Sequence, residues 1–170
     1  MKPTPQILST LGASLLLLFG CGGSGSSPDS RVVKLYGGDA GYGLLAERPV
    51  KAVRLKMLVP DGSDDSQDYE PTGDVVTLSD EQAARLEAML ASPKAYLWDV
   101  AKSCEPIYGV RLEIEADGHH LEVYLCLQCE LLQVMLDGKS VGSEDFDNIA
   151  PELIQLIKEL FPGDADIQGM

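Results

Sequence analysis

Residues 110–127 read VRLEIEADGHHLEVYLCL, and this stretch decides the fold. Apolar residues alternate with charged or polar ones on both sides of Asp117-Gly118, and a period of two is typical of half-buried β-strands. The Asp-Gly pair tolerates the positive φ angles of a tight hairpin turn. A turn at this point sets Val110 opposite Leu125. The stretch therefore predicts a β-hairpin with one apolar and one mostly charged face.

The flanking sequence adds further strands and two helices. Strands are predicted over residues 31–36, 49–59, 75–78 and 131–136. Ser79 and Gln82 are spaced as a capping box at the start of a helix that ends before Pro93, and a second amphipathic helix runs from about 148 to 161. The sequence therefore predicts an α+β domain, a mostly antiparallel sheet of four to six strands with two helices on one face.

The N-terminal residues have the pattern of a targeting signal. Lys2 precedes an apolar run over residues 11–19, which stops at Cys21 and is followed by a Gly/Ser tract. The run is shorter than the roughly 20 apolar residues of a transmembrane helix and fits a signal peptide. The order Leu18-Phe19-Gly20-Cys21 resembles the lipobox of a bacterial lipoprotein. This resemblance implies cleavage after Gly20, acylation of Cys21 and a lipid bilayer as partner.

The same resemblance divides the chain. Residues 1–20 are the signal peptide, 21–30 the lipidated cysteine and a flexible tether, 31–165 a single acidic α+β domain, and 166–170 a tail. Gly22 rather than an aspartate follows the cysteine, which by resemblance to enterobacterial sorting implies the periplasmic face of the outer membrane.

The net charge of the mature chain limits the kinds of partner that its domain can bind. Loss of the signal peptide leaves 12 basic residues against 27 acidic ones, a net charge of about −15. Nucleic acids and anionic lipid surfaces demand basic patches, so neither is an expected partner of the domain. Residues 61–74 carry six acidic side chains and no basic one, and they predict a solvated loop. Their spacing departs from that of an EF-hand loop, which leaves open only weak calcium binding.

Three cysteines in the domain carry the most distinctive chemistry. The hairpin register sets Cys104 opposite residue 131, so a bulge or a slip of one pair brings Cys104 close to Cys129. A disulfide between these two in an oxidising compartment, with Cys126 spare, is the first interpretation. A zinc site of Cys104, Cys126 and Cys129 is the alternative, although His119 and His120 lie at the distant tip of the hairpin. A redox role for Cys126-x-x-Cys129 is the third interpretation, although its strand-like flanks lack an activating helix N-terminus.

The sequence pattern around these cysteines also resembles a known pattern. Cys104-x-Pro106-x-x-Gly109-Val110-Arg111, followed by a strand and CxxC, is similar to an uncharacterised class of small bacterial domains. The likeness covers residues 80–160 and implies a fold without an activity. No nucleophile–base motif or phosphate-binding loop is evident. We therefore expect a non-enzymatic lipoprotein without a cofactor that binds an envelope protein or serves the envelope structurally. A zinc-binding or thiol-redox lipoprotein is the alternative.

Overall fold

The computed structural model describes residues 27–58 and 69–170, which form an antiparallel sheet flanked by helices. The six strands lie in the order β2-β1-β3-β4-β5-β6. They are β1 Val50–Met57, β2 Tyr69–Thr77, β3 Val110–Ala116, β4 His119–Cys126, β5 Leu131–Leu136 and β6 Lys139–Asp145. The α-helices are α1 Ser30–Leu35, α2 Asp39–Leu44, α3 Asp80–Leu90, α4 Ala150–Leu160 and α5 Ala165–Gln168. Short 3-10 turns occupy Pro93–Ala95 and Asp147–Ile149.

The hairpin of β3 and β4 has the predicted register. Val110 pairs with Leu125, and the turn residues Asp117 and Gly118 have φ angles of 53° and 79°. The valine, leucine and isoleucine side chains of both strands point to the same face and are buried, while Glu113 and Glu122 lie on the other face. Asp137 and Gly138 form a second turn of this kind between β5 and β6.

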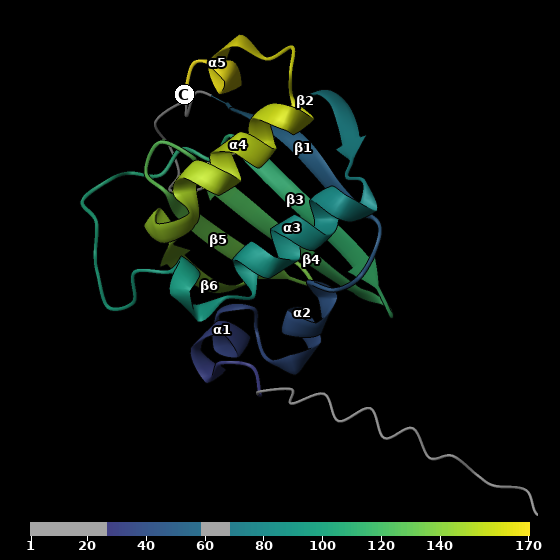
Figure 1. Cartoon of the computed structure of the whole chain (residues 1–170), viewed down its shortest axis with the longest axis vertical. Coiled ribbons are helices and arrows are strands. Elements are labelled where there is room, and N and C mark those ends of the chain that lie inside the picture. The colour runs from purple at the N-terminus through teal and green to yellow at the C-terminus, as the bar shows by residue number, and fades with distance from the viewer. Residues whose placement is uncertain (1–26, 59–68) are drawn as a thin grey trace, which may run out of the picture.

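Helices α3 and α4 cover one face of the sheet (Figure 1). The predicted capping box is present, because the Ser79 hydroxyl accepts from the Gln82 amide and the Gln82 side chain accepts from the Ser79 amide. The apolar stripe of α4 is buried against the sheet at Leu153, Leu156, Ile157 and Leu160. The predicted α+β class, with an antiparallel sheet and two long helices, is confirmed.

Two strand predictions near the N-terminus and the acidic segment need correction. Residues 31–36 form helix α1 and the residue that ends it, because the Asp29 carboxylate caps the Arg31 amide and Val32, Leu35 and Tyr36 bury one helical face. Strand β2 begins at Tyr69, well before the predicted residue 75, because it pairs with β1 along most of its length. The predicted signal peptide, lipobox and most of the acidic segment lie at residues 1–26 and 59–68, outside the described residues.

A second, smaller apolar cluster lies on the sheet face opposite the two long helices. It contains Val53 and Leu55 of β1 together with Tyr108, Cys126 and Cys129. Two of the three cysteines are therefore packed in one patch of the sheet.

The molecule has two different ends. Helices α1 and α2 lie together at one end, and α5 with the C-terminus lies at the other (Figure 1). Residues 166–170, assigned to a tail on sequence grounds, belong to α5 and its end, where Ile167 is fully buried. No helix among the described residues is both long and apolar enough to span a bilayer.

Candidate functional site

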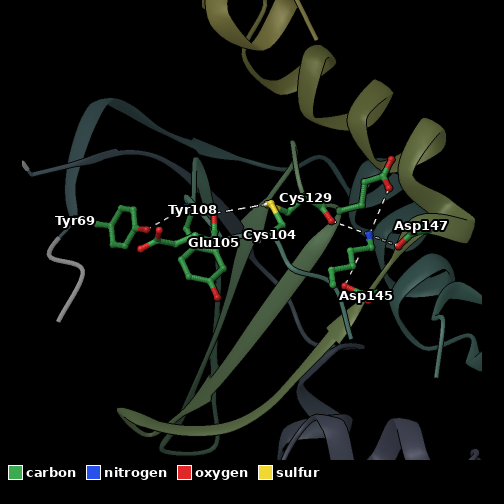
Figure 2. The surroundings of a disulfide bond; sticks show 9 residues. Tyr69, Cys104, Glu105, Tyr108, Cys129, Asp145 and Asp147 are labelled. Atoms are coloured by element: carbon green, nitrogen blue, oxygen red, sulfur yellow. Dashed lines mark hydrogen bonds and ion pairs between the residues drawn. A yellow bond between two sulfur atoms is a disulfide. The ribbon is translucent and has the colours of Figure 1, made fainter. Parts of the chain in front are cut away.

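A disulfide joins Cys104 to Cys129, with 6.1 Å between their Cα atoms (Figure 2). Cys104 is exposed in segment 99–109, which has no regular secondary structure, while Cys129 lies in the tight turn between β4 and β5. Cys126 ends β4 and is fully buried with a free thiol. This is the pairing that the hairpin register allowed, with Cys126 as the spare cysteine.

The zinc alternative is not assembled in this state of the chain. The disulfide occupies two of its three thiols, and the His119 Nδ1 atom lies 2.8 Å from the Asp137 carboxylate at the other end of the hairpin. The hydrogen bond from His119 lowers the pKa of Asp137. Within residues 27–58 and 69–170, no three His, Cys, Asp or Glu side chains are grouped closely enough to hold a metal ion.

Lys102 anchors the disulfide segment independently of the sulfur atoms. Its ammonium donates to the Cys129 carbonyl at 2.7 Å and to the Asp147 carboxylate at 2.6 Å (Figure 2). The Glu130 and Asp145 carboxylates lie 3.5 and 3.8 Å away. Segment 99–109 is therefore held at Cys129 by an ion-pair network as well as by the covalent bond.

The buried carboxylate of Asp145 depends on the Lys102 ammonium for charge compensation. It is 3% exposed, and its Oδ1 atom has no hydrogen-bond partner, so the nearest compensating charge is the Lys102 ammonium. Burial raises the pKa of Asp145, and the lysine partly opposes that rise. A buried carboxylate left without its cation is costly.

We expect Lys102→Met to lower the free energy of unfolding by about 2 kcal/mol at pH 7, since it leaves Asp145 buried and unpaired. Because the pKa of Asp145 is higher in the folded than in the unfolded chain, protonation stabilises the fold. That stability is complete below the ordinary value of 3.8 and is lost as pH rises through the raised pKa. The difference between variant and wild type should therefore shrink as pH falls from 7 towards 4.

Urea unfolding at several pH values measures this difference. Lys94→Met is the matched control, because Lys94 is an exposed lysine outside the network. A Lys102→Met loss that stays constant from pH 7 to pH 4 would show that Asp145 does not depend on the lysine.

Three tyrosines extend the site along the sheet. The Tyr108 amide donates to the Tyr69 hydroxyl at 3.1 Å, and the Tyr108 hydroxyl donates to the Gln133 side chain at 3.0 Å. The Tyr108 ring makes edge contacts with Tyr69 and with Tyr124, both at 5.8 Å between centroids. Burial raises the pKa of Tyr108 to about 12, so its hydroxyl stays protonated as a donor at neutral pH. These contacts fix the end of segment 99–109 that follows the disulfide.

The same segment forms one wall of a cleft of about 970 Å³. Ile107, Tyr108 and Gly109 line that wall, and the turn residues Leu127 and Gln128 continue it. The remaining lining residues come from the end of β1, from β2 and from α5: Arg54, Leu55, Lys56, Met57, Thr72, Asp164, Ala165, Asp166, Gly169 and Met170. The cleft therefore lies at the end of the sheet where the disulfide and the C-terminus meet.

Arg54 ties these walls together. Its Nε atom lies 2.7 Å from Asp164, and its Nη1 atom donates to the carbonyls of Gly109 and Leu55 at 2.7 and 2.8 Å. Amide donation from Ile167 and the contact with Arg54 lower the pKa of Asp164. The guanidinium of Arg54 therefore holds α5 and residues 107–109 in place. Its role in the cleft is structural.

The sequence did not single out the cleft residues. Arg54 and Asp164 are 110 positions apart and carry no shared motif. Of the residues that line the cleft, Ile107, Tyr108 and Gly109 fall inside the Cys-x-Pro-x-x-Gly pattern, which is their nearest sequence signal.

Comparison with known proteins gives no relative. No protein-family model matches the chain, and neither a curated protein nor a solved structure is significantly similar to it.

Proposed function

We propose that the protein is a lipoprotein anchored through acylated Cys21 to the periplasmic face of a bacterial outer membrane, and that its domain binds an envelope partner without catalysis. The address follows from the order of apolar run, Gly20, Cys21 and Gly/Ser tract. One acyl chain alone binds a bilayer marginally, so stable attachment calls for more than one chain on the cysteine.

The placement of the cleft is the observation that carries the binding role. The Gly/Ser tract after Cys21 precedes α1, which begins at Ser30, so the end of the domain with α1 and α2 is the one held near the lipid. The cleft is lined by Ala165 and Asp166 of α5. Helix α5 lies at the opposite end of the molecule from α1 and α2 (Figure 1). A domain held this way presents its cleft to the periplasm.

The chemistry of the cleft fits a protein segment. Ile107 and Met170 are two of its lining residues and remain 49% and 40% exposed, although they are large and apolar. Lys56 and Gln128, both exposed, supply polar contacts beside them. Apolar anchors with adjacent polar groups are typical of protein interfaces.

Fractionation with and without Cys21 tests the address. We expect the wild type to sediment with outer membranes and Cys21→Ser to appear in the soluble periplasmic fraction. A Cys21→Ser protein that still sediments with membranes would refute the lipid anchor.

Site-specific photocrosslinking tests the binding role in the same cells. A photoreactive residue at Ile107 should give one discrete adduct with an envelope protein, while the same residue at exposed Ala88 on α3 should not. The adduct at Ile107 should weaken in the Cys21→Ser background, because the partner is then no longer adjacent. Equal adducts from both positions, or none from Ile107, would refute the cleft as the binding surface.

A further inference from the structure

The buried thiol of Cys126 has no role in the binding function, yet it lies beside a disulfide. Cys126 is 0% exposed and Cys129 is 6% exposed, and both belong to the small apolar cluster on the open sheet face. Cys104 is exposed and lies outside this cluster. One sulfur of the disulfide therefore shares its packing with the free thiol, while the other faces solvent.

We propose that the Cys126 thiol exchanges with the Cys104–Cys129 disulfide and releases Cys104, so that the domain has two alternative disulfide states. The Cys126 sulfur bonds to the Cys129 sulfur and gives up its proton. The bond between Cys129 and Cys104 breaks, and the Cys104 sulfur takes up a proton. The products are a Cys126–Cys129 disulfide and a free Cys104 thiol. One disulfide and one thiol are present before and after, so the step needs no oxidant or reductant.

The geometry favours attack at Cys129. Cys126 is the last residue of β4, and Cys129 follows three positions later in the tight turn that leads to Leu131, the partner of Cys126 in β5. Residues three positions apart in a β-turn have Cα atoms within about 7 Å, near the range that a disulfide spans, and Cys126 and Cys129 have this spacing where the chain enters the turn. Because Cys126 is buried, exchange waits for local opening, and we expect it within minutes to hours.

Exchange changes the surface at the cleft. Segment 99–109 loses its covalent attachment to Cys129 but keeps Lys102 on the Cys129 carbonyl and the Tyr108 amide on Tyr69. The cleft wall at Ile107 is then attached only by these polar contacts and by the packing of the Tyr108 ring, and the adjacent Cys104 thiol is open to a cysteine of a bound partner. The covalent state of the cysteines thereby regulates the cleft of the proposed function.

The Cys104→Ala variant tests whether the second disulfide can form. After export to an oxidising periplasm, we expect this variant to be lighter than its reduced form by two hydrogen atoms, with Cys126 linked to Cys129. Two free thiols in the variant, under conditions that close the bond in the wild type, would overturn the proposal.

Alkylation of the folded, oxidised wild type tests the exchange itself and does not depend on the variant folding. With iodoacetamide under native conditions for a day, peptide mapping should find alkylated Cys104 together with a Cys126–Cys129 link. Cys126→Ala is the matched control and should leave Cys104 unlabelled. Alkylation of Cys126 with the original bond intact, or no alkylation, would overturn the proposal. Both readouts use purified protein, so they are independent of the lipid anchor and of the crosslinked partner.

Discussion

Replacing Cys104 and Cys129 together by alanine is expected to lower the free energy of unfolding by about 3.5 kcal/mol. The bond closes a loop of 25 residues, and in the chain-entropy model a loop of this length restricts the unfolded chain by about that amount. The loop joins segment 99–109 to the turn after β4, across the whole β3–β4 hairpin. For a domain of ordinary stability this is a large fraction of the total.

Urea unfolding followed by the fluorescence of Trp98 measures this loss. Trp98 is the single tryptophan, and it lies just before segment 99–109, with its ring under the Arg31 guanidinium at 4.7 Å. Chemical reduction of the wild type should reproduce the stability of the double variant. Cys126→Ala should cost about 1–2 kcal/mol at most, because it removes one buried atom and no cross-link. A double variant as stable as the wild type would show that the bond does not restrict the unfolded chain.

The Cys104–Cys129 bond is the one that the structure contains, so it is the resting state of the proposed exchange. The exchanged state becomes populated when something reacts with Cys104 and holds it apart, which is what binding of a partner with a reactive cysteine would do.

The hairpin of β3 and β4 could be predicted residue by residue. Its alternation of period two and its Asp117-Gly118 turn agree on one register, and a slip by one residue would move every buried side chain to the charged face. That register sets Cys104 opposite residue 131, and a bulge or a slip of one pair was needed to bring it to Cys129. Predictions were strongest where a local turn signal and a burial pattern specified the same pairing.

The apolar pattern over helix α1 was too short to distinguish a helix from a strand. Val32, Val33 and Leu35 among charged residues fit a strand over six positions about as well as a helix. The deciding features lay at the ends, where Asp29 caps the first turn and Gly37 and Gly38 adopt φ angles of 82° and 97° to end it.

The cleft could not be predicted, for a different reason. It exists because α5 docks on the end of β1, and the contacts of Arg54 with Asp164 and with Gly109 hold it there. Four helical residues with one buried isoleucine carry no periodic signal, and pairs separated by 110 positions leave no mark on local sequence. The ion pairs of Lys102 with Asp145 and Asp147 likewise join residues far apart in the sequence, so local patterns do not predict them.

Gly41→Ala is expected to lower the free energy of unfolding by about 3 kcal/mol or more, because α2 leaves no space for a side chain there. A Cβ atom at Gly41 would overlap the backbone carbonyl of Tyr36, and backbone cannot rotate away as a flexible side chain can. Tyr36 is fully buried, and its hydroxyl is hydrogen-bonded at 3.0 Å to the Tyr96 hydroxyl, which donates to the Leu90 carbonyl. Moving Tyr36 therefore disturbs the contact between the N-terminal helices and α3.

Gly43→Ala, two residues later in the same helix, is the matched control and should have the opposite sign. A Cβ atom there meets nothing within 4 Å, so alanine should raise stability by about 0.5 kcal/mol through its better helix propensity. Urea unfolding of both variants measures the pair of effects. Equal effects would mean that α2 does not pack on Tyr36 as described. Because Gly41 and Tyr36 lie outside the lining of the cleft, Gly41→Ala should leave the cleft intact.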